Sequence, residues 1–155
     1  MPKKSAGLLM YRQTSDGLEV LLVHPGGPFW TNKDEGAWTI PKGLIEEGEE
    51  PLGAAKREFA EETGCAPTGE FVPLDPVKQA GGKIVHAWAI RGNFELANLK
   101  SNSFSMEWPL KSGKYQSFPE VDRAGWFSME EARRKILNGQ LPLLEQLELI
   151  LQKQD

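Results

Sequence analysis

The N-terminal part of the chain alternates short apolar runs with polar turns. Residues 6–12 (AGLLMYR) and 18–24 (LEVLLVH) are apolar runs of the length of buried strands, and an Asp-Gly pair at 16–17 is a turn signal. These features predict a β-hairpin. Residues 24–38, rich in Pro, Gly and Asn, predict a loop after it.

A short extended piece, WTIP (38–41), separates this loop from a segment with helical character. The Ala-rich run at 51–63 has good helix propensity, and Pro51 suits a first helical position. Gly64 lies where a glycine commonly ends a helix. The sequence therefore predicts a helix over residues 51–63.

The next part of the chain predicts two strands and a long insert. The strands, at 69–79 and 83–90, flank a turn at Gly81-Gly82. Residues 92–119 are polar and aromatic without a clear period. A loop of that length in a small domain is usually functional or mobile.

The C-terminal part predicts a strand and two helices. Within RAGWFSMEEARRKIL (123–137), a strand leads into a helix that Ser128 caps, with Glu131 three residues on, and Asn138-Gly139 ends that helix. Residues 142–153 then predict an amphipathic helix. The order of elements implies an α/β fold, a mixed β-sheet covered by helices on both faces, in a single domain over residues 1–155.

Composition narrows the class of ligand. The 155 residues suit one compact domain, and 18 basic against 22 acidic residues leave a net charge of −4. This mild acidity offers no basic surface, so we expect no nucleic-acid partner. An anionic ligand would need a few local Lys and Arg residues or a bound metal ion.

Cysteine and hydropathy patterns bear on the compartment. Cys65 is the only cysteine, so no disulfide can form within the chain. The N-terminus lacks the pattern of a signal peptide, and no run of about 18 apolar residues could span a membrane. We expect a cytoplasmic protein with no membrane partner; its oligomeric state is left open.

The predicted helix at 51–63 crowds three carboxylates on one side. At about 100° per residue, Glu58, Glu61 and Glu62 share an arc of about 100°. Leu52, Phe59 and their neighbours form an adjoining apolar stripe that we expect to face the sheet. Carboxylates at this spacing repel one another by a few tenths of a kcal/mol per pair.

Two interpretations account for this crowding. One is a solvated acidic helix face, with Arg57 and Glu61 as an i,i+4 ion pair. The other is a site for a hard cation, since Mg²⁺ takes carboxylate oxygens together with substrate phosphates. Spacing alone leaves both open.

The surrounding residues favour the cation site. Gly43, five residues, Glu49, seven residues and then the run Arg57–Cys65 (REFAEETGC) match every fixed position of the pattern G-x5-E-x7-R-E-U-x-E-E-x-G-U, where U is apolar. The segment resembles the Nudix box, although cysteine is a less usual last residue. WTIPKG before the box and GWFSMEEA near the end extend the resemblance over most of the chain.

The resemblance implies a fold, an activity and a set of roles. Nudix enzymes have an α/β/α sandwich fold and cleave pyrophosphate linkages of nucleoside diphosphate derivatives with Mg²⁺ or Mn²⁺. By the resemblance, Glu58, Glu61 and Glu62 ligate metal, and the carbonyl of Lys42 joins them. Glu49 and Arg57 hold the loop against the helix, and the glutamate sometimes also reaches metal-bound water.

A further acidic residue from a late loop contributes in some members, six positions before a tryptophan. Glu120 stands six before Trp126 and is the candidate for a fourth ligand or general base. Glu107 and Asp122 are alternatives, and an exposed loop carboxylate without a role is another reading of Glu120.

Phosphoanhydride hydrolysis needs charge neutralisation and a water in line with the leaving group, both of which metal ions supply. We expect Glu58 or Glu120 to orient or deprotonate this water. A lysine should contact phosphate, and the candidates are Lys42, Lys33, Lys78 and Lys83.

For the substrate, Pro41-Lys42-Gly43 after Trp38 resembles the asymmetric dinucleoside tetraphosphate hydrolases, with similar lead-ins in diphosphoinositol polyphosphate hydrolases. Trp30 and Trp108, in predicted loops, are candidates to stack on a base. Trp88 and Trp126 are ordinary core positions, and His86 is more often structural than catalytic.

Diadenosine tetraphosphate or a close relative is the first choice of substrate. The alternatives are a house-cleaning nucleoside triphosphate pyrophosphatase and a non-catalytic nucleotide-sensing module, although the intact box argues against the latter. An isomerase on this scaffold would need a catalytic cysteine elsewhere, and Cys65 at the end of the box does not supply it.

Overall fold

The computed structural model describes residues 3–153, which form a sheet, a separate hairpin and three α-helices. The elements in chain order are β1 (Lys4–Thr14), β2 (Gly17–Pro25), β3 (Lys42–Leu44), α1 (Pro51–Thr63), β4 (Val72–Pro73), β5 (Val77–Lys78), η1 (Ala80–Gly82), β6 (Ile84–Arg91), η2 (Leu96–Asn98), β7 (Ser103–Glu107), β8 (Tyr115–Pro119), β9 (Val121–Ser128), α2 (Met129–Lys135), η3 (Asn138–Gln140) and α3 (Leu141–Lys153), where η denotes a short 3-10 helix.

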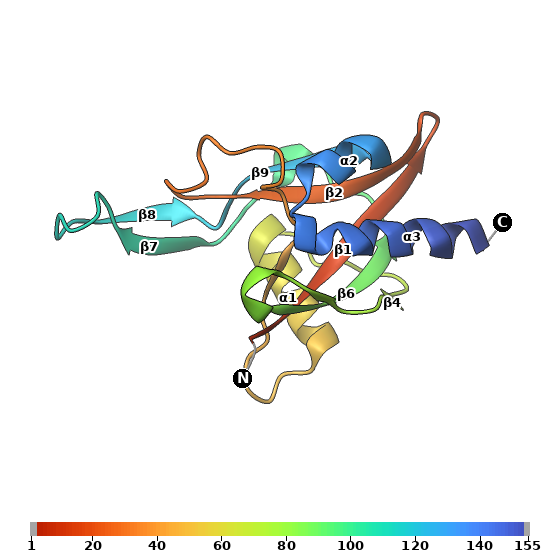
Figure 1. Ribbon diagram of the computed structural model, residues 1–155, viewed down its shortest axis with the longest axis horizontal. Coiled ribbons are helices and arrows are strands. Elements are labelled where there is room, and N and C mark those ends of the chain that lie inside the picture. The colour runs from red at the N-terminus through yellow and green to blue at the C-terminus, as the bar shows by residue number, and fades with distance from the viewer. Residues whose placement is uncertain (1–2, 154–155) are drawn as a thin grey trace.

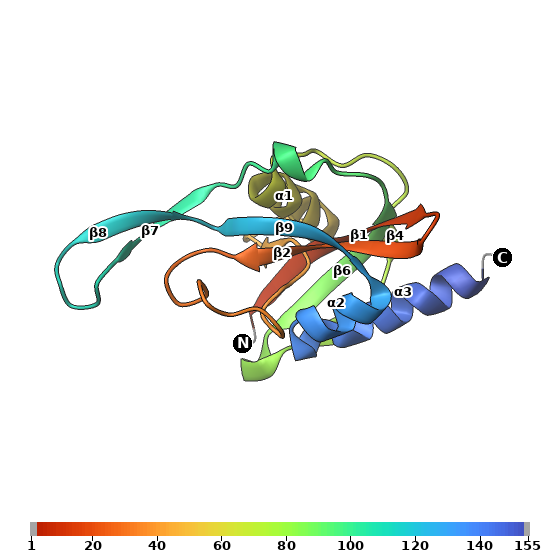
Figure 2. The ribbon, with the colours of Figure 1, turned by 90° about the horizontal axis from the view of Figure 1, so that it is seen from above.

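The main sheet is mixed and lies between two helical layers. Its strand order is β4-β6-β1-β2-β9, with β3 paired to β1 and β5 paired to β6. The β1–β6 pair is parallel and the other pairs are antiparallel. Helix α1 covers one face, and α2 and α3 cover the other (Figures 1 and 2). The predicted α/β/α sandwich is therefore confirmed.

Each face of the sheet has its own apolar core. On the α1 face, Ala54, Ala55 and Phe59 of the helix are fully buried against the inward side chains of β1 and β6. On the other face, leucines of α3 pack with residues of β2 and α2. The apolar stripe predicted for the first helix thus faces the sheet, and the acidic arc borders it.

Helix ends follow the predicted signals closely. Gly64 caps α1 in the left-handed conformation, with φ of 83°, which glycine adopts without strain. The Ser128 side chain accepts from the Glu131 backbone N–H and caps α2. That helix ends at Lys135, three residues earlier than the Asn-Gly pair predicted, and η3 follows.

The insert at 92–119 differs from the predicted irregular loop. Strands β7 and β8 pair antiparallel as a two-stranded hairpin that projects from the body (Figure 1). Phe104 opposes Phe118 on one face, and the ring of Phe104 lies against Gly27 of the first loop. Phe104, Met106 and Trp108 alternate with Ser103, Ser105 and Glu107, which is the period of a strand, whereas Tyr115–Pro119 (YQSFP) shows no such alternation.

Two other segments also depart from prediction. The expected strand at 69–79 is two short strands, β4 and β5, which both pair with β6. Strand β3 follows Pro41, where no strand was predicted, and it places the start of the box against β1. Within residues 3–153, none of the helices is long and apolar enough to cross a membrane.

Candidate metal centre and adjoining cavity

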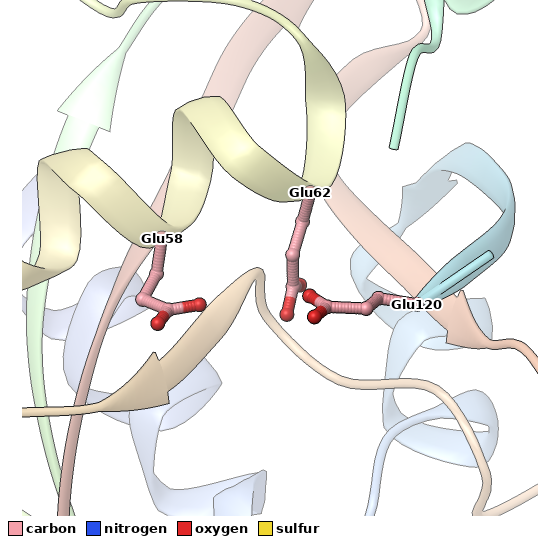
Figure 3. Close-up of side chains that lie close together, drawn as sticks. All are labelled: Glu58, Glu62 and Glu120. Carbon is pink, nitrogen blue, oxygen red and sulfur yellow. The ribbon is translucent and has the colours of Figure 1, made fainter. Parts of the chain in front are cut away.

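Three carboxylates from two distant segments converge at one end of α1. Glu58 and Glu62 extend from the helix, and Glu120 reaches them from the turn between β8 and β9 (Figure 3). One oxygen of each lies within 4.8 Å of the others. The predicted contribution of Glu120 is thus geometrically available.

Backbone hydrogen bonds at the root of the hairpin hold Glu120 in place. The Asn102 N–H donates to the Glu61 carbonyl at 2.8 Å, and the Glu120 N–H donates to the Asn102 carbonyl at 2.8 Å. The Gly26 N–H in turn donates to the Glu120 carbonyl. Glu120 is therefore tied through the chain to the end of the helix that carries the other two carboxylates.

Gly43 creates the space in which Glu58 lies. A β-carbon at this position would stand 2.0 Å from the Glu58 carboxyl carbon, far inside van der Waals contact. The β3 backbone and the carboxylate can approach this closely only when residue 43 has no side chain. This contact gives a physical reason for glycine at the first position of the box.

Arg57 organises the loop between β3 and α1. Its guanidinium donates twice to Glu49, at 2.8 and 3.0 Å, and once to the Leu44 carbonyl at 3.0 Å. It also donates to Glu58 at 2.8 Å and to Glu61 at 3.1 Å. Glu61 accepts from Arg57 and is not one of the three carboxylates whose oxygens lie within 4.8 Å of one another.

This ion-pair network shifts the pKa values of its members in opposite directions. Hydrogen bonds from Arg57 lower the pKa of Glu49 to about 2, and the same hydrogen bonds raise the pKa of Arg57. The loop is therefore held by charged groups across the neutral pH range. The predicted roles of Glu49 and Arg57 in bracing the loop agree with this arrangement.

The three converging carboxylates have raised pKa values, in contrast to Glu49. Burial raises the pKa of Glu62 to about 8, and burial is also the main cause that raises the pKa of Glu58 and of Glu120. Repulsion among the three adds to the shift of Glu62. A bound cation would stabilise the charged form of these half-buried carboxylates.

A cavity of about 390 Å³ opens beside this group. Glu62 and Glu120 line it together with Lys42 and Lys83, and Trp30 forms part of the wall. Burial lowers the pKa of Lys42, whose backbone N–H also donates to Glu62 at 3.3 Å. Two predicted phosphate ligands and one predicted base platform therefore share a cavity with the carboxylates.

The other aromatic candidates lie elsewhere. Trp108 is in the projecting hairpin and packs edge-to-face on Phe29, with ring centroids 5.6 Å apart. It is not among the residues that line this cavity, and its stacking on a base stays a prediction. Trp38 is buried, and its Nε1 donates to Asp34 at 2.8 Å.

The alternative acids and lysines are also engaged away from the carboxylate group. Glu107 accepts from two backbone N–H groups in the hairpin turn. Asp122 lies 2.8 Å from Nδ1 of the buried His24. The Lys33 ammonium lies over the Trp30 ring at 5.2 Å, and Lys78 lies in the short strand β5, outside the cavity lining.

Two glutamines, Gln79 in the cavity lining and Gln140 bonded to it, were not predicted from the sequence. Gln79 lines the cavity, and the fully buried Gln140 donates from Nε2 to the Gln79 Oε1 at 2.8 Å. The two residues are 61 positions apart and belong to no motif, so no local signal in the chain could have paired them.

Comparison with known proteins places this geometry in a family. A family model described as the NUDIX domain matches residues 1–147. A C. elegans Ap4A hydrolase structure, in a binary complex, is 25% identical with a TM-score of 0.65, covering 97% of this chain and 98% of that one.

Two further solved structures share the fold. The NUDIX domain of Shewanella oneidensis NrtR, complexed with ADP ribose, is 19% identical with a TM-score of 0.66, covering 97% of this chain and 89% of that one. A mutT/nudix family protein of Listeria innocua is 18% identical with a TM-score of 0.66, covering 99% and 97%. The chain belongs to the Nudix family and is a hydrolase that acts on pyrophosphate bonds.

Proposed function

We propose that this enzyme is a Mg²⁺- or Mn²⁺-dependent pyrophosphohydrolase of a dinucleoside polyphosphate such as diadenosine tetraphosphate. The observation that carries the proposal is the convergence of Glu58, Glu62 and Glu120 beside a cavity that Lys42 and Lys83 also line. The likeness to an Ap4A hydrolase over nearly the whole length of both chains supports the choice of substrate.

The donor set fits a hard divalent cation. Glu58, Glu62 and Glu120 present only carboxylate oxygens, which Mg²⁺ and Mn²⁺ prefer, and Mg²⁺ commonly takes substrate phosphates as further ligands. Glu61 and the Lys42 carbonyl are further ligands in the proposal. Bound there, the ion would neutralise phosphate charge and acidify a water molecule.

The chain's own groups then have separate tasks. Glu58 or Glu120 orients the attacking water and accepts its proton. Lys42 and Lys83, which both line the cavity, bind the phosphates as point charges. Trp30 offers a flat apolar surface for one base. Arg57 holds the loop between β3 and α1 in a fixed position relative to the glutamates of α1.

A substrate panel tests the proposal. Dinucleoside polyphosphates, nucleoside triphosphates and nucleotide sugars are incubated with the protein and excess Mg²⁺ or Mn²⁺, and the products are identified by chromatography. Hydrolysis of diadenosine tetraphosphate with the highest kcat/KM supports the proposal. Failure to hydrolyse any member with either metal would refute catalysis, and a clear preference for nucleoside triphosphates would refute the substrate. Oxygen-18 from water would mark the phosphorus attacked.

The substitution Gly43→Ala is expected to inactivate the enzyme through Glu58. The new methyl would overlap the Glu58 carboxylate, so either β3 or that side chain must move. Overpacking of this kind costs about 1–3 kcal/mol of stability, and a shift of a catalytic group by about 1 Å can cost about 100-fold in rate. The measurements are kcat at saturating Mg²⁺ and the free energy of unfolding in urea.

Gly53→Ala is the matched control. Gly53 lies in α1, the helix that carries Glu58, and a β-carbon there would meet nothing within 4 Å. Alanine in a helix interior is favoured over glycine by about 1 kcal/mol, so this variant should be slightly more stable and fully active. Full activity of Gly43→Ala would show that the close approach to Glu58 is not needed.

A further inference from the structure

A chain of three hydrogen-bonding groups ends in the wall of the cavity. The Ile40 backbone N–H donates to the Gln140 Oε1 at 3.0 Å. The Gln140 Nε2 donates to the Gln79 Oε1 at 2.8 Å. Gln140 is fully buried, whereas Gln79 lines the cavity that holds Trp30, Lys42 and Lys83.

The first link determines the orientation of both amides. A backbone N–H is only a donor, so the Gln140 atom that faces Ile40 must be the carbonyl oxygen. Its amino group therefore faces Gln79, and the Gln79 atom that receives this donor must also be oxygen. The orientation follows from the backbone, and neither amide can turn over without losing a bond.

Gln79 is left with a defined set of free hydrogen-bonding positions. No hydrogen bond within residues 3–153 uses its Nε2 hydrogens. Its Oε1 retains a second lone pair beyond the one that Gln140 occupies. Gly139 lies directly behind it, because a β-carbon at Gly139 would be 2.9 Å from the Gln79 Cα. The side chain thus presents one donor and one acceptor in a fixed order.

The lining of the cavity around Gln79 combines charged and apolar groups, as a site for a nucleotide would. Two carboxylates and two lysines line it, Glu62, Glu120, Lys42 and Lys83. The remaining wall is largely apolar, formed by Val23, Pro25, Trp30, Val121 and Leu137. A polyphosphate would gain nothing from such a wall, whereas a flat heterocycle attached to a phosphate would contact both parts.

We propose that Gln79, held by Gln140, reads the edge of an adenine base bound in this cavity and rejects guanine. An amide pairs with adenine by donating to a ring nitrogen and accepting from the 6-amino group. Guanine has a 6-oxo acceptor at the latter position, which would face the Gln79 oxygen. A free glutamine could turn its amide over to suit guanine, but Gln140 prevents that turn.

Gln140 is therefore a positioning residue and Gln79 is the residue that touches the base. The inference rests on the proposed nucleotide substrate and adds the base that the cavity selects. It also gives the two residues different expected phenotypes. Loss of Gln79 should weaken adenine binding, and loss of Gln140 should admit guanine.

The test compares equilibrium binding of ADP and GDP by calorimetry at one fixed Mg²⁺ concentration. The wild type should bind ADP about tenfold or more tightly than GDP, since one mispaired polar contact costs about that much. Gln79→Leu should lose ADP affinity and bring the ratio near one. Gln140→Leu should also bring the ratio near one, but by a gain in GDP affinity.

Gln146→Leu provides a matched control. Gln146 also bonds through both ends of its amide, to the backbone of Asp75, but it lies on α3 outside the cavity lining. This variant should keep the wild-type ratio. Equal binding of ADP and GDP by the wild type would overturn the proposal, as would an equal loss of both nucleotides in Gln140→Leu, which would mark a merely structural role.

The binding readout separates this inference from the proposed catalysis. If ADP is preferred and Gln140→Leu gains GDP affinity while no nucleotide in the panel is hydrolysed, the base assignment holds and the hydrolytic proposal fails. If diadenosine tetraphosphate is hydrolysed while ADP and GDP bind equally, the hydrolytic proposal holds and the role of Gln79 is refuted.

Discussion

Replacing Glu58 by Gln is expected to lower kcat for Mg²⁺-dependent hydrolysis by about 100- to 10,000-fold, the range typical for loss of a catalytic acid–base group. Glutamine retains the shape of glutamate, and its carbonyl can still accept from Arg57. It fits the same narrow space over Gly43. The substitution removes only the negative charge and the capacity to take a proton, and both belong to the proposed role.

The measurement is steady-state hydrolysis of the best substrate over a Mg²⁺ titration, with circular dichroism to confirm folding. Glu47→Gln is the control, because Glu47 is exposed in the loop before α1 and outside the carboxylate group. Activity of Glu58→Gln within tenfold of wild type would exclude Glu58 as the base and as an essential ligand. The solvated-face interpretation of the acidic helix would then regain support.

The helix that carries this site was predictable because its signals are local. Pro51, the apolar stripe and Gly64 each act over one or two turns, so the direction of the buried face follows from the sequence. The clustering of Glu58 and Glu62 on that helix is likewise a matter of spacing. What the spacing does not specify is the third carboxylate.

Glu120 was found through resemblance, since nothing in the chain between 92 and 119 indicates where that segment returns. Its position depends on the β7–β8 hairpin closing and on the bonds that link Asn102 to the end of α1. The hairpin pairs only with itself, so its strands need no continuous apolar face to form. Pairings of this kind, like that of Gln79 with Gln140, arise from tertiary structure and leave no periodic signal.

Different bonding partners divide the tasks of the two carboxylate sets. Glu49 accepts hydrogen bonds from Arg57, so it stays charged and braces the loop. Glu62 is largely buried and near other carboxylates, so its charge is costly without a cation. The same short stretch thus contains a permanent ion pair and a site whose charge is stabilised by what it binds.

The metal-free protein is expected to lose stability as the pH rises from about 4.5 to 8. Glu62 has a pKa of about 8 in the folded chain, against an ordinary value of 4.5 when unfolded. Between these values the folded state holds a proton that the unfolded state has released, so the free energy of unfolding falls with pH. The slope is at most about 1.4 kcal/mol per pH unit for one proton and levels off above the folded pKa.

Saturating Mg²⁺ should remove this decline, because an ion bound to the carboxylates replaces the proton and stabilises the folded state by mass action. Urea unfolding at pH 5.5–8.5, with EDTA or with Mg²⁺, measures both effects. The raised pKa values of Glu58 and Glu120 act in the same direction, so Glu62→Gln is needed to isolate one group. This variant should be more stable than wild type at pH 8 in EDTA and should gain less from Mg²⁺. A wild-type decline that Glu62→Gln shares in full would place the titrating group elsewhere, and an unchanged Mg²⁺ response would remove Glu62 from the metal site.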